Sequence, residues 1–214
     1  MIENNDLKNM RLSYERDQLI ESNISKDPFV QFTIWFDFVL KAEIFEPNAM
    51  TIATAAKNGI PSARVVLLKE YDETGFTFFS NYGSRKGKEL SENPFASLLF
   101  WWRELERQVR IDGRVEKISK KESQKYFNVR PLKSRYGALA SNQSEVVKDR
   151  EFLENKFADL EKKFGNNPPM PENWGGYKLV PSRFEFWQGR RDRLHDRICY
   201  EKVENNWKIS RLSP

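Results

Sequence analysis

The sequence contains one cysteine and one histidine among its 214 residues, and this scarcity excludes several kinds of site. The single cysteine, Cys199, cannot form a disulfide within the chain, which fits a reducing cytoplasm, and we expect it to be a small buried apolar residue. One cysteine and one histidine cannot build the common structural zinc sites, so we expect no metal. The sequence also lacks a Walker loop, a G-x-G-x-x-G motif and a G-x-S-x-G motif, so a nucleotide must be held by side chains.

Long hydrophobic runs and long basic runs are also missing. Residues 1–23 lack the apolar region of a signal peptide, and the most apolar stretch, residues 29–40, is interrupted by polar residues and is too short to cross a membrane. Lysine and arginine (36) exceed aspartate and glutamate (31), which gives a net charge of +5, but the basic residues come in twos and threes. We therefore expect a soluble cytoplasmic protein that binds neither membrane nor nucleic acid.

The pattern of apolar residues predicts one α+β domain over residues 25–214, preceded by a polar, flexible arm at residues 1–24. Asp27-Pro28 is an N-cap followed by proline, which predicts a helix start. Short alternating segments dominate after residue 50, so we expect an antiparallel β-barrel with flanking helices. The expected strands cover residues 50–54, 63–71, 76–79, 96–102, 106–118, 174–187, 193–203 and 207–211, and further helices start at Ser84 and Ser119 and follow Ser144.

A first candidate phosphate site is Ser84-Arg85-Lys86, at an expected helix start. Free backbone N–H groups, the positive helix end, a hydroxyl and two cations would meet one phosphate there. The alternative is a capped helix with a solvated basic face. Two further cations, Arg64 and Lys69, bracket four apolar residues on one expected strand. Because side chains alternate along a strand, Arg64 and Lys69 are predicted to point to opposite faces and to bind different anions, unless a bulge intervenes. The alternative is that both are cations at strand ends whose charged groups simply reach water.

A second candidate phosphate site lies at the end of the helix that Ser119 starts. Tyr126 and Arg130 are four residues apart, and therefore on one side of a helix, and Ser134 follows with a hydroxyl. A guanidinium can bind a phosphate through two parallel hydrogen bonds. The alternative here is ordinary helix termination before Pro131.

The run Arg193-Leu194-His195-Asp196-Arg197 contains the only histidine of the chain. On a strand, Arg193, His195 and Arg197 would share one face. Three cations in a row repel one another unless something anionic or electron-rich lies across them. A lone histidine is more often structural than catalytic, but its position between Arg193 and Arg197 favours a functional role for His195.

In their order along the chain, these segments resemble the pyridoxine/pyridoxamine 5'-phosphate oxidase family of homodimeric FMN-binding split-barrel flavoproteins. The resemblance runs from end to end and is most specific near the C-terminus. It includes Arg64-Val-Val-Leu-Leu-Lys69, Ser84-Arg85-Lys86, Glu106-Arg-Gln108-Val, Tyr126-Phe, Arg130-Pro131, Ser134, Gln143-Ser144, Phe184-Glu-Phe-Trp187-Gln-Gly, Arg193-Leu-His195-Asp-Arg197 and Trp207 to Pro214.

The resemblance implies which residues bind each ligand. FMN would be held on one subunit by Arg64, Val65, Val66, Leu67, Leu68, Lys69, Phe79, Ser80, Arg85, Lys86 and Gln108. From the partner chain, the pocket would be completed by Gln143, Ser144, Trp187 and Arg197. The substrate phosphate would contact Lys69, Tyr126, Arg130 and Ser134, while the pyridine ring would lie against Arg193, Leu194 and His195. Arg193 and His195 are the implied catalytic residues.

The resemblance also implies that Arg11 and Tyr14 belong to an N-terminal segment that covers the substrate. Leu12-Ser13 between them departs from the charged pair expected in the family. Other departures are Leu139, where relatives often carry tryptophan, Arg135-Tyr136 after the substrate serine, and the doubled Arg190-Arg191. None of these departures removes an implied ligand. They leave open the preference between alcohol and amine, the turnover rate and any secondary site for pyridoxal 5'-phosphate.

The implied reaction is the oxidation of pyridoxine 5'-phosphate or pyridoxamine 5'-phosphate to pyridoxal 5'-phosphate. A hydride would pass from C4' of the substrate to N5 of FMN, and O2 would reoxidise the flavin and yield H2O2. Two alternatives remain: a split-barrel protein that binds flavin or pyridoxal phosphate without turnover, and a flavin reductase that uses a nicotinamide donor. The paired phosphate sites favour the oxidase, because a reductase needs no second phosphate clamp.

Overall fold

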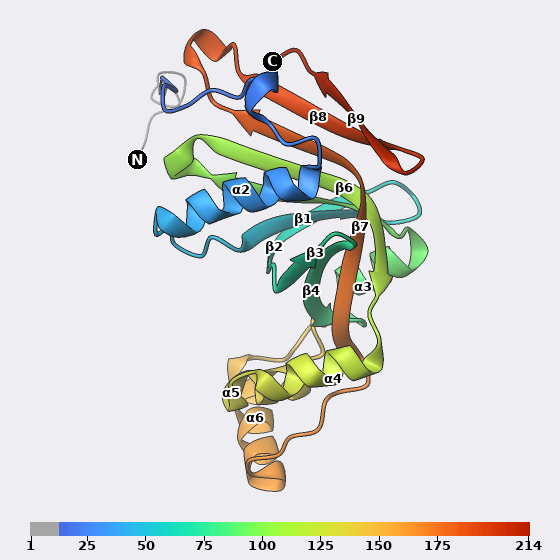
Figure 1. Cartoon of the computed structure of the whole chain (residues 1–214). Helices are drawn as coiled ribbons and strands as arrows, with labels where there is room; N and C mark the ends of the chain where they lie inside the picture. Colours follow the sequence, from blue (N-terminus) through green and yellow to red (C-terminus); the bar gives the residue numbers. More distant parts are fainter. Residues whose placement is uncertain (1–12) are drawn as a thin grey trace, which may run out of the picture. The chain divides into compact units, whose positions relative to one another are not determined.

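The computed structural model describes residues 13–214, a mixture of helices and one antiparallel sheet (Figure 1). Along the sheet the strand order is β2-β1-β5-β6-β7-β4-β3, and β8 pairs with β7 and β9 with β8. The expected α+β class is confirmed. The elements are α2 (Pro28–Lys41), β1 (Ala49–Ala55), β2 (Pro61–Leu67), β3 (Glu70–Asp72), β4 (Gly75–Asn81), α3 (Arg85–Glu92), β5 (Phe95–Trp102), β6 (Arg107–Lys117), α4 (Lys120–Val129), α5 (Leu132–Ala140), α6 (Arg150–Phe164), β7 (Trp174–Gln188), β8 (Asp196–Val203) and β9 (Asn206–Arg211).

The chain divides into two compact units, which we describe separately. The first unit holds the described residues up to Pro47 together with Leu99–Ile111 and Arg183–Pro214, and the second holds Asn48–Leu98 and Asp112–Ser182. The expected arm at residues 1–24 and the single domain at residues 25–214 stay predictions. No helix in the described part of the chain is long and apolar enough to span a membrane.

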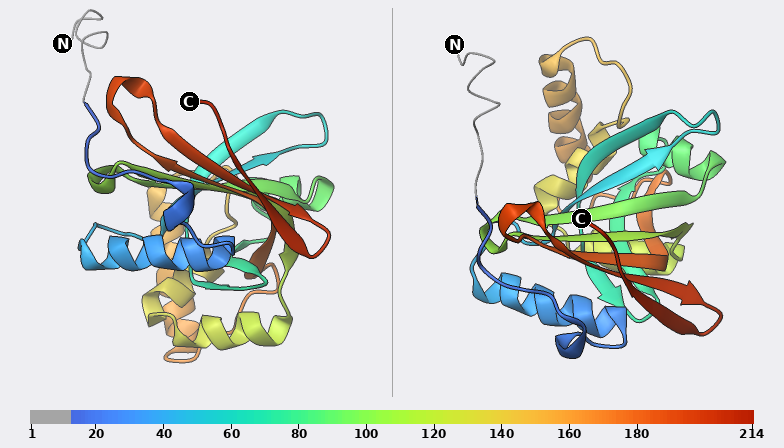
Figure 2. Two further views of the ribbon diagram at one scale, coloured as in Figure 1. Left: turned by 45° about the horizontal axis from the view of Figure 1, so that its top comes forward. Right: turned by 90° about the horizontal axis from the view of Figure 1, so that it is seen from above.

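The first unit is built around α2. The carboxylate of Asp27 accepts hydrogen bonds from the N–H groups of Phe29 and Val30, and Pro28 occupies the first turn, as the sequence predicts. The buried face of α2 carries Phe32 and Trp35, whose rings lie 5.3 Å from those of Phe100 and Phe186 respectively. Both views of Figure 2 show α2 beside the strands that close the chain, where Phe29 contacts Phe184 of β7 and Trp207 of β9. Cys199 is buried in β8, as expected.

The second unit contains the β1–β2 hairpin, strands β3 and β4 and helices α3 to α6. Two helix starts follow their sequence signals: the Ser84 hydroxyl accepts from the Gly87 N–H, and Ser119 and Glu122 form a capping box. Strand β4 pairs with the first half of β7, and Phe76 and Phe78 are fully buried there. Helices α4, α5 and α6 gather at one end of this unit (Figure 1).

Three sequence predictions were wrong. Residues 63–71 are not one strand, because the Leu68 N–H donates to Asn48 O while the next N–H, of Lys69, donates to Thr77 O. The chain thus leaves β1 for β4 at this point, and the argument that Arg64 and Lys69 face opposite sides of one strand does not apply. Helix α5 (Leu132–Ala140) was missed, because the sequence analysis assigned no element between the helix that Ser119 starts and the helix that follows Ser144.

The third error concerns the row of cations. Residues 191–193 form a 3-10 helix, and Asp192 and Arg193 have left-handed backbone angles, with φ of 56° and 61°. Strand β8 begins only at Asp196. Arg193 and His195 therefore precede the strand, and they do not share a strand face with Arg197.

Candidate active site

A cavity of about 710 Å³ lies in the second unit. It collects residues that the sequence places far apart, from β2, β4, α3, α4, α5, the segment after α5 and the start of β7. Its walls include most of the predicted phosphate and flavin ligands of this unit. They are Val65, Val66, Leu67, Lys69, Phe79, Ser80, Lys86, Tyr126, Arg130, Ser134 and Gln143, joined by Asn81, Val129, Pro131, Gly137, Ala138, Ser141 and Trp174, which were not predicted.

One side of the cavity is organised by Lys86. Its ammonium group donates to Ser80 Oγ at 3.1 Å and to Gln143 Oε1 at 2.9 Å. Burial, followed by the nearby charge of Arg64, lowers the pKa of Lys86. Gln143 was expected to reach the site from a partner chain, yet here it lies against Lys86 of its own chain. A buried ammonium whose contacts are neutral oxygens is suited to receive an anion.

Arg64 and Arg85 are held by Glu89, a residue that the sequence analysis did not select. Arg64 Nη2 lies 3.2 Å from Glu89 Oε2, and Arg85 Nε lies 2.9 Å from Oε1. Burial raises the pKa of this carboxyl, but hydrogen bonds from Ser62, Thr54 and the two arginines outweigh burial and lower the pKa to about 2. The only signal in the sequence was the spacing of four residues between Arg85 and Glu89.

Not every predicted flavin ligand lines the large cavity. Arg64 turns toward Glu89, and Leu68 is buried in the core. Arg85 instead lines a neighbouring cavity of about 310 Å³, together with Gln143 and Ser144. Gln143 therefore borders both cavities.

The other side of the large cavity is aromatic. Phe79 and Tyr126 stack at 3.9 Å, and the ring of Trp174 lies 5.4 Å from that of Phe79. The Arg130 guanidinium lies 4.7 Å from the Trp174 ring centre. Trp174 was missed because it reads as an ordinary strand residue, and it is the first residue of β7.

Arg130 is the C-cap of α4, and its Nη1 is buried without a hydrogen-bond partner. Burial lowers the pKa of the guanidinium, but an arginine stays charged in a protein. An unpaired buried guanidinium is costly unless a ligand supplies an acceptor. Lys69, Lys86 and Arg130 all line the cavity, and none of the described residues in its lining is acidic. The cavity therefore fits phosphorylated ligands.

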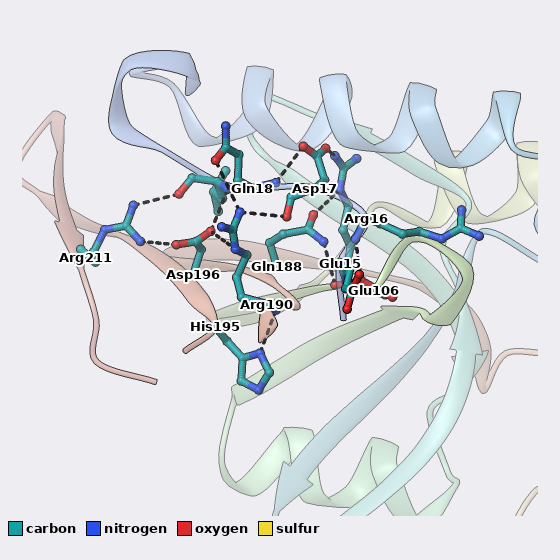
Figure 3. Close-up of polar contacts among 12 residues, drawn as sticks. Glu15, Arg16, Asp17, Gln18, Glu106, Gln188, Arg190, His195, Asp196 and Arg211 are labelled. Atoms are coloured by element: carbon teal, nitrogen blue, oxygen red, sulfur yellow. Dashed lines mark hydrogen bonds and ion pairs between the residues drawn. The ribbon is translucent and has the colours of Figure 1, made fainter. Parts of the chain in front are cut away.

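The remaining predicted residues lie in the first unit, where His195 is the centre. Its Nδ1 accepts the N–H of Arg190 at 3.1 Å, so the proton of the neutral ring is on Nε2 (Figure 3). The ring lies 4.6 Å from that of Trp187 and 5.8 Å from that of Tyr14. Burial, followed by the charge of Arg193, lowers the pKa of His195. Leu194 and Arg193 are exposed beside it.

Arg197 is fixed by a buried acid in the same unit. Its Nε donates to Glu185 Oε1 at 2.9 Å, and its Nη1 donates to Ser213 O at 2.7 Å. Glu185 is 3% exposed and also pairs with Arg110 and Arg183. Gln108 lies on β6, and Arg11 is outside the described residues. Among the described residues, no group of three or more His, Cys, Asp or Glu side chains could hold a metal ion.

Comparisons with known families cover most of the chain. A family model described as pyridoxamine 5'-phosphate oxidase matches residues 37–164, and one described as the pyridoxine 5'-phosphate oxidase C-terminal dimerisation region matches residues 174–214. A Burkholderia mallei (strain SAVP1) relative named pyridoxine/pyridoxamine 5'-phosphate oxidase is 54% identical over 211 residues, which cover 97% of this chain and 99% of the relative.

Solved structures also resemble the chain, among them the following two. PhzG from Burkholderia lata 383, solved in complex with tetrahydrophenazine-1-carboxylic acid, is 34% identical with a TM-score of 0.88, over 92% of this chain and 98% of that chain. A pyridoxamine 5'-phosphate oxidase-related, FMN-binding protein from Nostoc punctiforme PCC 73102 is 15% identical with a TM-score of 0.69, over 86% of this chain and 97% of that chain. The second likeness bears on the fold alone. The predicted split-barrel fold is confirmed by these matches.

Proposed function

The chain belongs to the pyridoxamine 5'-phosphate oxidase family, and we propose that it oxidises pyridoxine 5'-phosphate or pyridoxamine 5'-phosphate to pyridoxal 5'-phosphate. Its cofactor is FMN. The observation that carries the proposal is the cavity of the second unit, which presents Lys69, Lys86 and Arg130 and no acid among its described lining residues. One phosphate at Lys86 and another at Arg130 would neutralise these cations, which is what a phosphorylated cofactor and a phosphorylated substrate together provide.

When bound, FMN would supply the electron acceptor for removal of a hydride from C4' of the substrate, with O2 as the final oxidant and H2O2 as its product. Lys86, Ser80 and Gln143 would hold the flavin phosphate, with Arg64 and Arg85 kept in place by Glu89. The further flavin contacts proposed are Val65, Val66, Leu67, Leu68, Lys69, Phe79, Gln108, Ser144, Trp187 and Arg197.

The substrate phosphate would be gripped by Arg130, whose buried Nη1 lacks an acceptor, with help from Lys69, Tyr126 and Ser134. Binding the substrate phosphate fixes the position of the pyridine ring that reacts. The binding energy of this remote contact therefore helps to align the ring for the reaction. Arg193 and His195 would orient the pyridine ring and stabilise charge that develops on it.

The protein acts as a homodimer, in agreement with the dimerisation region matched at residues 174–214. We place FMN at the interface, with Ser144, Trp187 and Arg197 contributed by the partner chain. Gln143 already contacts Lys86 within one chain, so its contribution needs no second subunit. We also propose a cytoplasmic location, since a single cysteine suits a reducing compartment.

The experiment is an aerobic peroxide assay on the purified, FMN-loaded protein without nicotinamide. Pyridoxine 5'-phosphate and pyridoxamine 5'-phosphate are compared with tetrahydrophenazine-1-carboxylic acid, because PhzG was solved with that compound. Peroxide formed with the phosphorylated vitamers supports the proposal. Turnover of the phenazine compound alone would show a different substrate class, a need for a nicotinamide donor would show a flavin reductase, and binding without turnover would show a carrier.

A further inference from the structure

A segment near the N-terminus, Tyr14–Leu19, lies against the turn that carries His195, and polar contacts join the two (Figure 3). The Leu19 N–H donates to Asp196 Oδ2 at 3.0 Å, and the side chain of Arg191 pairs with Glu15. We call residues 14–19 the strap. Arg190 and Arg211 also donate hydrogen bonds to the strap. Three further hydrogen bonds join the strap to two consecutive residues, Glu106 and the first residue of β6, Arg107.

Glu106 bonds both the strap and the histidine-bearing segment. Its carboxylate Oε2 accepts the N–H groups of Glu15 at 2.9 Å and Arg16 at 3.1 Å. Its backbone carbonyl accepts the Gly189 N–H at 2.8 Å and the Gln188 side-chain amide at 3.2 Å. The residue has a left-handed backbone, with φ of 53°, which requires surrounding contacts to hold a non-glycine residue in that conformation.

Arg107 makes a parallel connection through its side chain, which is only 8% exposed. Nη2 lies 2.6 Å from Asp17 Oδ2, Nε donates to Gln188 Oε1 at 2.9 Å, and the guanidinium lies over the Trp35 ring. Nη1 is buried without a hydrogen-bond partner. Asp17 thus supplies the carboxylate that compensates the buried charge of Arg107. The interaction energy of such a pair depends strongly on its geometry.

These contacts place the Tyr14 ring against Gly189, close in space to His195. A Cβ atom added to Gly189 would lie 2.7 Å from Tyr14 Cγ, so the ring sits where any other residue would project a side chain. The Tyr14 ring is 5.9 Å from the Trp187 ring and 5.8 Å from the His195 ring. The strap therefore places the Tyr14 ring over Gly189 and beside the rings of Trp187 and His195.

We propose that Glu106 and Arg107 are positioning residues that clasp the strap through Asp17 and two backbone amides, and so hold Tyr14 against His195. The inference deepens the proposed function, on which it rests for the role of His195. Neither residue touches the reacting atoms in this scheme. Their effect on the reaction is transmitted by Tyr14.

The test is Asp17→Asn in the FMN-loaded protein, because this replacement removes the charge that pairs with Arg107 and nearly keeps the size of the half-exposed side chain. Hydrogen exchange of the Glu15 and Arg16 amides should accelerate at least about tenfold, the loss expected for one charge-assisted hydrogen bond. The chain has one histidine, so a single ring signal reports on His195 in NMR. Its pKa should move up toward the ordinary value as Tyr14 withdraws. KM for the phosphorylated substrate should rise more than kcat falls.

Two matched variants sharpen the result. Asp159→Asn removes the same charge from an exposed position on α6 and should change neither the exchange rates nor the histidine signal. Gly189→Ala displaces the Tyr14 ring without touching the Asp17–Arg107 pair, and it should raise the pKa of His195 in the same way. Unchanged amide exchange and an unchanged histidine pKa in Asp17→Asn would overturn the proposal. Both measurements are independent of turnover, so a wild-type protein inactive on the vitamers would count against the proposed function alone.

Discussion

The Lys86 ammonium and the Gln143 side-chain oxygen meet at 2.9 Å although 57 positions separate them in the sequence. With Ser80, they form a polar corner in which the cation has no acidic partner within hydrogen-bonding distance among the described residues. Lysine in such a corner contributes its charge to a ligand more than to the fold.

Lys86→Ala should therefore weaken retention of FMN by roughly ten- to a hundredfold, the usual loss for one charge-assisted contact. The dissociation constant can be measured by the recovery of flavin fluorescence on dilution. Lys88→Ala, on the same helix, is the matched control. Equal FMN affinity in the Lys86 variant and the wild type would contradict the assignment of this corner to the flavin phosphate.

Arg130→Ala should raise KM for pyridoxine 5'-phosphate by a similar factor while the purified protein stays yellow, because its unpaired Nη1 is assigned to the substrate. Steady-state kinetics and the flavin absorption spectrum measure the two effects separately. Arg130→Lys should recover only part of the loss, since a lysine cannot bind a phosphate with two parallel hydrogen bonds. Loss of flavin with unchanged KM would show that the two phosphate assignments are interchanged.

His195→Ala should fold, dimerise and keep FMN, with kcat/KM lower by about 10², or roughly 2.7 kcal/mol of transition-state stabilisation. Anaerobic single-turnover reduction of the flavin at saturating substrate measures this directly. The Arg193→Ala variant is expected to behave alike. Wild-type reduction rates in both variants would leave His195 and Arg193 as structural residues.

The pH dependence of His195 has a defined direction. Its Nδ1 accepts a hydrogen bond only when unprotonated, so the arrangement with Arg190 is lost as pH falls through a pKa that lies below the ordinary value of about 6.5. The unfolded chain takes up this proton more readily, so the contribution of His195 to stability is present above about pH 6.5 and is lost as pH falls. A pH series of rates in wild type and His195→Ala should show this acid limb in the wild type alone.

Glu89→Gln should destabilise the protein near pH 7 by on the order of 3 kcal/mol, because the native carboxylate has its pKa lowered to about 2 by four hydrogen-bond donors. The folded pKa is below the unfolded one, so this stability is complete above the unfolded pKa and disappears as pH falls toward 2. Chemical denaturation at several pH values should show the difference from wild type shrinking between pH 5 and pH 3. Glu104→Gln, at an exposed position, controls for the charge.

Local signals in the sequence were sufficient for the helix starts. Asp27, Ser84 and Ser119 each cap the helix that they were expected to cap, because an N-cap acts within three residues of itself. The break at Leu68 could not be predicted in the same way. It depends on hydrogen bonds to Asn48 and Thr77, which belong to other strands.

In the candidate site, too, some residues could be identified from the sequence and others only from the folded structure. Pattern and resemblance identified Lys86, Tyr126 and Arg130, and these three side chains do line one cavity. Glu89 was missed because an acid among lysines on a helix looks like an exposed residue until the hydroxyls of Thr54 and Ser62 are brought to it. The left-handed backbone at Asp192 and Arg193 leaves no trace in residue type, since neither is glycine.

That backbone makes position 193 a place where stability and chemistry compete. A left-handed conformation costs a residue with a Cβ atom about 1 kcal/mol that glycine does not incur. A search for thermostable variants should therefore recover Arg193→Gly, and the same substitution removes a guanidinium proposed to act on the substrate. Selection for heat resistance would then favour glycine at position 193, whereas selection for turnover would favour arginine.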